Sequence, residues 1–160
     1  MSAAPSLILA SASPRRLDLL RQIGIEPAGV APTAIDETPG RGELPRALAA
    51  RLAAEKADAA ATAAPDGAVV LAADTVVALG RRALPKAEDE ATARACLALL
   101  SGRRHKVHGG ITAIGPDGAA RHRLITTAVA FKRLTDAEIE RYIASGDWHG
   151  KAGGYGIQGR

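Results

Sequence analysis

The chain has a single cysteine and very few aromatic side chains. Cys96 is the only cysteine among 160 residues, so an intrachain disulfide is excluded. Its place in an apolar helical stretch predicts a small buried thiol. Phenylalanine, tryptophan and tyrosine together make up only 2% of the residues, too few and too dispersed for a base-stacking platform that binds single-stranded nucleic acid. The core must therefore consist of leucine, isoleucine, valine and alanine.

Long apolar runs are also absent, and none approaches the roughly 20 residues that a membrane-spanning helix needs. The residues before Leu7 have neither the positive charge nor the apolar stretch of a signal peptide. We therefore expect a cytoplasmic chain with no membrane partner. The net charge of +4 favours an anionic partner, but the basic residues occur as scattered pairs, so we expect no stable nucleic-acid complex. The pairs are Arg15-Arg16, Arg81-Arg82 and Arg103-Arg104.

The length fits one domain, 1–160, and the residue pattern alternates between strands and helices. We expect an α/β fold with one central sheet and helices packed on it. The expected strands are Leu7–Ala10, 68–73 continuing as 76–79, a hairpin arm at 83–84, 105–114 and 121–134, with an extended segment at 30–38. The expected helices are 14–23, 45–64 and 89–100. A fourth helix is expected to begin at a capping box at Thr135 and to end at Gly146.

Two of these helices have a clear apolar spacing. In the first, Leu17, Leu20 and Ile23 are spaced for one buried face. In the second, Leu48 and Leu52 are expected to be buried together with the neighbouring alanines.

Two arginines stand where the first helix begins. Ser13 is a good N-cap residue, and Pro14 is well placed at the first helical position. Arg15 and Arg16 then fall in the first turn, where the helix dipole disfavours cations by about 0.3–1 kcal/mol each. A bound anion would explain them, because first-turn N–H groups bind phosphate and guanidinium groups recognise it bidentately. The alternative is that both arginines are solvated surface residues.

Asp74 interrupts an apolar stretch that should lie in the sheet. An ionised carboxylate there needs a cation, a metal or hydrogen-bond donors, unless it occupies a turn or bulge at a strand end. Asp36 and Glu37 lie in a proline-broken segment and could give a hard cation a second carboxylate, or form a solvated loop.

Further candidates are lysines and a glycine-rich end. Lys56 and Lys86 are either phosphate ligands or surface lysines. The glycine-rich segment Gly150–Gly159 allows close approach of a ligand to the backbone, but it lacks the spacing of a P-loop. His105 and His108 have no further cysteine or histidine nearby, so polar strand residues are a better interpretation than a zinc site.

The order of these motifs resembles the Maf family of nucleoside triphosphate pyrophosphatases. The motifs are Ser11-Ala12-Ser13-Pro14-Arg15-Arg16, Ile35-Asp36-Glu37, Glu55-Lys56-Ala57, Ala73-Asp74-Thr75 and Tyr155-Gly156-Ile157-Gln158-Gly159. The resemblance covers essentially the whole chain. It implies an elongated mixed sheet of the inosine triphosphate pyrophosphatase type, flanked by helices, with a central cleft. It also implies hydrolysis of a nucleoside triphosphate to the monophosphate and diphosphate with Mg²⁺ or Mn²⁺.

The resemblance also implies residue roles. Asp74 would be the proton acceptor, and Asp74 and Glu37 would hold the metal. The substrate-binding and specificity residues would be Ser13, Arg15, Arg16, Lys56, Thr75, Lys86 and Gln158. The Ser-Pro-Arg-Arg and Tyr-Gly-Ile-Gln-Gly strings match the branch that acts on dTTP and UTP. The alternatives are a catalytically impaired nucleotide-binding regulator of cell division, or a pyrophosphatase for modified purine nucleotides such as 7-methyl-GTP.

Two departures from the family pattern stand out. Ala87 follows Lys86 where the family usually has proline, which predicts a less fixed loop. Family members continue for several tens of residues after the glycine-rich motif, so the chain is expected to be a fragment or a C-terminally short member. A homodimer is one possible assembly.

Overall fold

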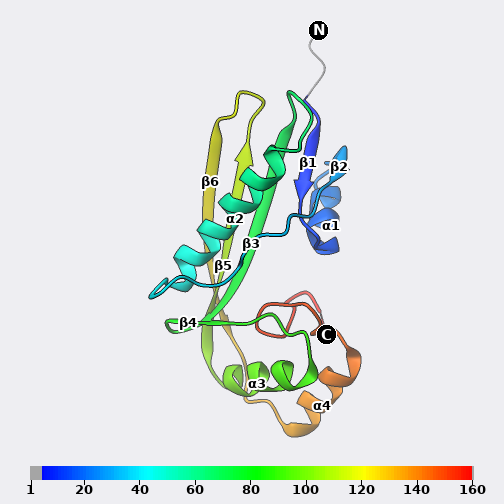
Figure 1. Cartoon of the computed structure of the whole chain (residues 1–160). Helices are drawn as coiled ribbons and strands as arrows, with labels where there is room; N and C mark the ends of the chain where they lie inside the picture. The colour runs from blue at the N-terminus through cyan, green and yellow to red at the C-terminus, as the bar shows by residue number, and fades with distance from the viewer. Residues whose placement is uncertain (1–4, 160) are drawn as a thin grey trace. The chain divides into compact units, whose positions relative to one another are not determined.

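The computed structural model describes residues 5–159, which form six strands and four helices (Figure 1). The α/β class and the mixed sheet expected from the sequence are confirmed. The strands are β1 (Leu7–Ala10), β2 (Gly29–Val30), β3 (Val69–Leu79), β4 (Arg82–Leu84), β5 (Arg104–Ile114) and β6 (Ala120–Ala130). The helices are α1 (Pro14–Gln22), α2 (Pro45–Ala61), α3 (Glu90–Leu100) and α4 (Asp136–Ser145).

The strand order in the sheet is β2-β1-β3-β5-β6, with β4 paired to β3. Strand β1 is parallel to both β2 and β3, and Leu9 lies opposite Val30 on one side and Leu71 on the other. Strand β4 returns antiparallel to β3 with Leu84 opposite Val77, so the predicted hairpin is confirmed. Gly80 has a φ of 60° at this turn, a left-handed conformation that glycine adopts without strain.

By its internal contacts the chain divides into two compact units. The first unit consists of residues 5–41, 48–74 and 109–124, and the second of residues 42–47, 75–108 and 125–159. The predicted cleft and the single domain 1–160 stay predictions. No helix in the described part of the chain has the length and apolar character to cross a membrane.

The core of the first unit lies between α2 and the sheet. Alanines of α2, Ala57 and Ala60, pack against Val70 and Ala72 of β3 and against Ile114 of β5. Figure 1 shows α2 running alongside these strands. Because alanine is small, the helix axis can approach the sheet closely. The predicted burial of Leu48 and Leu52 is confirmed as well.

Helix α1 differs from the sequence expectation. None of its residues is buried, and Ile23, which follows the last helical residue, is 69% exposed. The predicted buried face of Leu17, Leu20 and Ile23 is therefore wrong. The spacing is amphipathic, but Leu17 and Leu20 are only half-buried.

Three element boundaries also differ. The extended segment expected at 30–38 forms strand only at Gly29–Val30, because its prolines remove backbone donors. Helix α2 ends at Ala61, three residues before the expected end. Strand β6 ends at Ala130, so the expected strand to 134 is too long.

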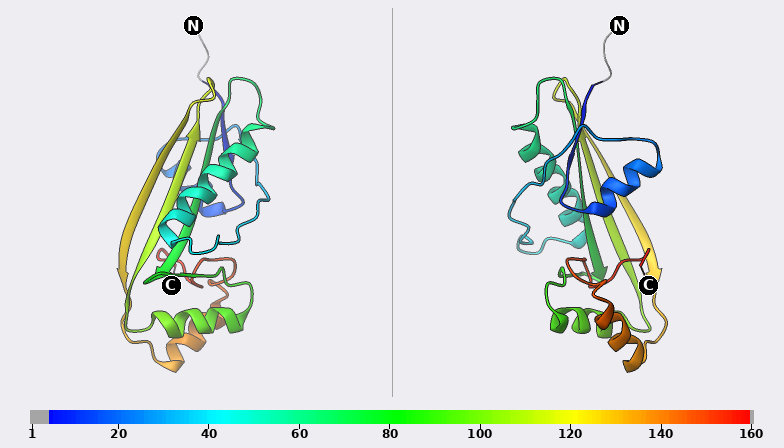
Figure 2. Two further views of the ribbon diagram at one scale, coloured as in Figure 1. Left: turned by 60° about the vertical axis from the view of Figure 1, so that its left-hand side comes forward. Right: turned by 90° about the vertical axis from the view of Figure 1, so that its right-hand side faces the viewer.

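The core of the second unit contains α3, α4 and the chain's few aromatic rings. Figure 2 shows the two helices side by side in both views. Leu97 of α3 packs with Ile143 and Trp148, and the Trp148 indole N–H donates to the Ile143 carbonyl at 2.9 Å. Cys96 is buried, as predicted. The predicted capping box at Thr135 and Glu138 is present and begins α4.

Candidate functional site

Asp74 is the most buried charged side chain of the first unit, with 3% of its surface exposed. Strand β3 runs through it without a break, so the alternative of a turn or bulge at a strand end is excluded. Side chains alternate between the faces of a strand, so Asp74 shares a face with Val70 and Ala72. Those residues pack under α2. The carboxylate therefore points to the side of the sheet that α2 covers.

Lys56 of α2 provides the cation that this carboxylate needs. Its ammonium lies 2.5 Å from Asp74 Oδ1 and 2.8 Å from Glu37 Oε1, and the residue is 7% exposed. Lys56 follows the buried Leu52 by four residues and precedes the buried Ala60 by four, so it belongs to the helix face turned to the sheet. The interpretation of Lys56 as a surface lysine is thus wrong.

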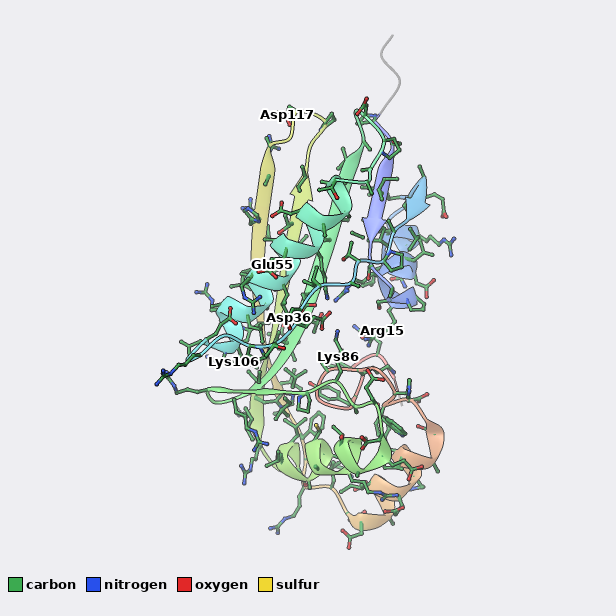
Figure 3. The ribbon with its side chains drawn as sticks, in the orientation of Figure 1. Arg15, Asp36, Glu55, Lys86, Lys106 and Asp117 are labelled. Carbon is green, nitrogen blue, oxygen red and sulfur yellow. The ribbon has the colours of Figure 1, made fainter. Side chains whose placement is uncertain are left out.

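The segment that carries Glu37 is fixed to α2. The Asp36 carboxylate accepts a hydrogen bond from the Thr38 N–H at 2.9 Å, and hydrogen bonds from Thr38 hold the pKa of Asp36 below its ordinary value. Arg51 donates to the Thr38 carbonyl at 3.1 Å and to the Glu55 carboxylate at 3.2 Å. Figure 3 shows Asp36 on this segment and Glu55 on α2. These bonds on either side of Glu37 direct its carboxylate toward Lys56.

The turn between β1 and α1 is organised by Ser11. Its hydroxyl oxygen accepts hydrogen bonds at 3.1 Å from the Ser13 N–H and at 3.1 Å from the Arg16 guanidinium. Ser13 occupies the predicted N-cap position with extended dihedrals, but its side chain makes no capping hydrogen bond. Pro14 stands at the first helical position, as expected. The sequence analysis missed Ser11, although its spacing of two residues before the N-cap suits an ST-turn.

Arg16 lies in the electrostatic field of the two carboxylates. Burial lowers the pKa of its guanidinium, the charge of Asp74 raises it, the neighbouring Arg15 lowers it and Glu37 raises it. An arginine stays charged throughout the physiological range. Arg15 is exposed and extends from the first turn of α1 (Figure 3). The first unit thus brings together Arg16, Lys56, Glu37 and Asp74, four of the residues predicted to form the site.

The two carboxylates suit a hard divalent cation. Glu37 and Asp74 both contact one ammonium, which shows that a single positive charge can be shared between them. Mg²⁺ is commonly held by one or two carboxylates, with water and substrate phosphates as further ligands. No cluster of three or more histidine, cysteine, aspartate or glutamate residues suited to a metal occurs among residues 5–159. The donor set therefore fits Mg²⁺ or Mn²⁺ shared with a phosphate, and it does not fit a closed metal site.

The remaining predicted residues belong to the second unit. Thr75 follows Asp74 on β3 and is exposed. Lys86 lies on the loop after β4 (Figure 3) and forms an antiparallel bridge with Ala152 in the glycine-rich segment. Gln158 is exposed in a turn near the end of that segment, where the Gly159 N–H donates to the Gly156 carbonyl at 2.9 Å.

The loop that carries Lys86 is hydrogen-bonded to the glycine-rich segment. The Ala87 N–H donates to the Lys151 carbonyl at 3.1 Å, and the Ala87 carbonyl accepts from the Gly150 N–H at 2.8 Å. A proline at position 87 could not make the first of these bonds. The alanine thus gives the loop a hydrogen bond that proline would lack, and the expectation of a less fixed loop stays a prediction.

The two histidines of β5 are buried and hydrogen-bonded to hydroxyl groups. His105 pairs with Tyr155 and His108 with Thr126. Their interpretation as polar residues of a strand agrees with these contacts.

Comparisons with known proteins point to one family. The sequence model of the Maf-like proteins matches residues 6–160. A dTTP/UTP pyrophosphatase of Paramagnetospirillum magneticum is 67% identical over 153 residues, covering 96% of this chain and 80% of the relative. A dTTP/UTP pyrophosphatase of Novosphingobium aromaticivorans is 64% identical over 155 residues, covering 97% of this chain and 77% of the relative.

A solved structure supports the fold. The Ham1 protein of Staphylococcus aureus matches with a TM-score of 0.54 and 21% sequence identity, covering 77% of this chain and 70% of that protein. At this identity the likeness concerns the fold alone.

Proposed function

The chain belongs to the family of Maf-like proteins, and on that premise we propose that it hydrolyses dTTP and UTP to the nucleoside monophosphate and diphosphate. Relatives with 64% and 67% identity carry the name dTTP/UTP pyrophosphatase. The observation that carries the proposal is the cluster of the first unit, in which a buried carboxylate stands among cations that can accept a polyphosphate.

In this reaction Asp74 acts as the proton acceptor. Its carboxylate takes the proton of the water that attacks the α-phosphorus, and the diphosphate leaves. Its burial and its contact with Lys56 fix its position, so no rearrangement is needed when the proton is transferred.

Two cations of the first unit bind the triphosphate. Arg16 offers planar, bidentate hydrogen bonds to phosphate oxygens, and Ser11 orients its guanidinium. Lys56 offers a compact charge that two carboxylates already hold in place. Ser13 adds to this site from the turn, and Lys86 from the second unit is proposed as a further phosphate ligand.

Glu37 and Asp74 are proposed to hold the divalent metal, Mg²⁺ or Mn²⁺. When bound, the metal supplies positive charge to the phosphate oxygens on which negative charge develops.

Arg15, Thr75 and Gln158 are proposed to determine the base. Uracil and thymine present two carbonyl oxygens on either side of one N–H. An arginine that only donates and a glutamine that both donates and accepts suit that edge. The same pair suits the edge of cytosine less well.

We further propose a cytoplasmic enzyme that forms no membrane or stable nucleic-acid complex and that self-associates as a homodimer. The exposed apolar side chains Leu19, Ile23, Ile25 and Val30, all in the first unit, support self-association. Light scattering after gel filtration would give the oligomeric state.

The function is tested with the purified protein and Mg²⁺ or Mn²⁺. Canonical triphosphates and 7-methyl-GTP are supplied in turn, and diphosphate and monophosphate are measured together. We expect both products in equal amounts from dTTP and UTP, with at least tenfold lower kcat/KM for purine nucleotides. Release of inorganic phosphate without diphosphate, or no product from dTTP and UTP, would overturn the proposal.

A further inference from the structure

The rare aromatic rings of this chain gather around one histidine. In the second unit, the His105 ring meets Phe131 edge-on with centroids 5.1 Å apart and Tyr155 edge-on at 5.5 Å. Phe131 and Tyr155 also meet edge-on, at 4.8 Å. The three rings therefore support one another in a fixed geometry, since edge-on aromatic pairs are favourable.

A hydrogen bond inside this cluster ties the histidine to the glycine-rich segment. His105 Nε2 lies 2.5 Å from the Tyr155 hydroxyl, and the histidine is only 3% exposed. Burial lowers the pKa of His105, and burial, together with Tyr142, raises the pKa of Tyr155 to about 12. Both groups are therefore neutral near pH 7, and the bond joins a phenol to an imidazole.

The Tyr155 hydroxyl is the one hydrogen-bond partner of the His105 ring within residues 5–159. Its Nδ1 is buried without a hydrogen-bond partner among the described residues. A buried polar group that is left half satisfied costs stability, and a phenylalanine would fill the same space without that cost. The Tyr155 bond is thus the polar contact that a histidine provides at this position.

A second tyrosine holds the next residue of the segment. The Tyr142 hydroxyl accepts a hydrogen bond from the Gly156 N–H at 3.3 Å. The Gly156 carbonyl in turn accepts from the Gly159 N–H at 2.9 Å and closes a turn around Gln158. The segment is therefore anchored at Tyr155 and Gly156 by two hydroxyl groups, while Gln158 is exposed at the turn that follows.

Resting on the proposed function, we propose that His105 is a positioning residue for base selection, which acts through the Tyr155 hydroxyl to fix the turn that presents Gln158. A turn held in place loses less freedom when a base binds, so the correct base is bound more tightly. An amide that is free to move would accommodate the wrong bases as well. His105 touches no substrate in this scheme and acts only through the segment.

The test removes the hydroxyl and keeps the ring. Tyr155→Phe retains the contact with Phe131 and loses only the bond to His105. We expect the KM for dTTP and UTP to rise about fivefold, kcat to change less than twofold, and the preference for dTTP over dCTP to fall about fivefold. His105→Phe should give the same pattern.

The Gln158→Ala variant tests whether the effect of Tyr155→Phe on base preference passes through Gln158. If His105 and Tyr155 act through Gln158, adding Tyr155→Phe to Gln158→Ala changes the dTTP/dCTP preference by less than twofold. His108→Gln is the matched control, because His108 is a buried histidine of the same strand that bonds Thr126 instead. Its preference should equal that of the wild type, whatever its stability.

The outcomes separate this inference from the proposed function. A wild-type protein that releases no diphosphate from dTTP or UTP contradicts the function itself. A selective wild type whose preference survives in Tyr155→Phe within twofold contradicts the positioning role alone. So does an undiminished effect of Tyr155→Phe in the Gln158→Ala background. If His105→Phe does not fold, the Tyr155→Phe results decide.

Discussion

The Lys56 ammonium lies 2.5 Å from Asp74 Oδ1, and this ion pair is buried between α2 and β3. The pair joins the helix to the sheet at the point where the proposed reaction occurs. Removal of Lys56 leaves the buried Asp74 carboxylate without this cation, which costs far more than the loss of an exposed ion pair, whereas removal of Asp74 leaves Lys56 paired with Glu37. The same contact thus serves both the stability of the first unit and its chemistry.

Asp74→Asn should stop turnover and leave nucleotide binding nearly intact. The amide keeps the shape of the side chain but cannot take a proton from water. We expect kcat to fall by about 10²–10⁴-fold, the usual contribution of a general base. The measurement is diphosphate release for kcat, with calorimetric titration of dTTP for binding. Asp66→Asn, an exposed aspartate of the first unit, is the control and should behave as the wild type. An Asp74→Asn enzyme with undiminished kcat would remove Asp74 from the mechanism.

Lys56→Met should destabilise the protein in the absence of metal, and added Mn²⁺ should restore part of the loss. Without the ammonium, Asp74 and Glu37 lose the positive charge that both contact, so we expect unfolding to become easier by about 3–5 kcal/mol. A divalent cation replaces the missing charge, so Mn²⁺ should raise the Tm of the variant more than that of the wild type.

Thermal denaturation with and without Mn²⁺ measures both effects. Lys106→Met, which alters an exposed lysine of β5, is the control and should shift Tm little under either condition. Equal Mn²⁺ effects on the wild type and on Lys56→Met would contradict a metal site at the two carboxylates.

Much of the fold could be predicted because its signals are local. The Ser13-Pro14 start of α1 and the capping box of α4 each lie within a few residues. The need of Asp74 for a cation followed from the apolar residues on both sides of it, since a charge within a buried strand must be compensated.

The partners of the site residues could not be predicted in this way. Glu37 lies on a loop, Lys56 on a helix and Asp74 on a strand, so no sequence periodicity relates the three residues. Only the resemblance to a family linked them. The bond between His105 and Tyr155 joins residues fifty positions apart. The predicted burial of Leu17, Leu20 and Ile23 is wrong for another reason. Spacing shows which side chains share a helix face, but it does not show how fully other elements cover that face.

Gly110→Ala should destabilise the first unit by separating α2 from the sheet. A Cβ at Gly110 would overlap the Ala49 carbonyl and lie 3.1 Å from Ala53 Cβ, so the helix would have to move. We expect a loss of about 1–3 kcal/mol, the usual cost of overpacking, seen as a lower urea midpoint with an unchanged slope. Ala120→Val, at the exposed start of β6, should change the midpoint little. A Gly110→Ala midpoint equal to that of the wild type would show that α2 is free to shift.

Glu138→Gln should remove an acid-sensitive part of the stability of the second unit. Hydrogen bonds from Lys132 and from the Thr135 backbone lower the pKa of Glu138 from 4.5 to about 2. A carboxyl whose pKa is lower in the folded state stabilises the fold above its unfolded pKa, and this contribution is lost as pH falls through the folded value. The wild type should therefore exceed Glu138→Gln in Tm at pH 7 by an amount that stays constant down to about pH 5, shrinks below pH 4.5 and is largely lost near pH 2.

Glutamine retains the capping-box geometry, so the comparison of Glu138→Gln with the wild type isolates the charge. In a Lys132→Met background the loss should be smaller and should be complete at a higher pH, because the largest cause of the lowered pKa is gone and the folded pKa lies closer to 4.5. A Tm difference that does not vary between pH 7 and pH 2 would show that Glu138 contributes no titrating charge to the fold.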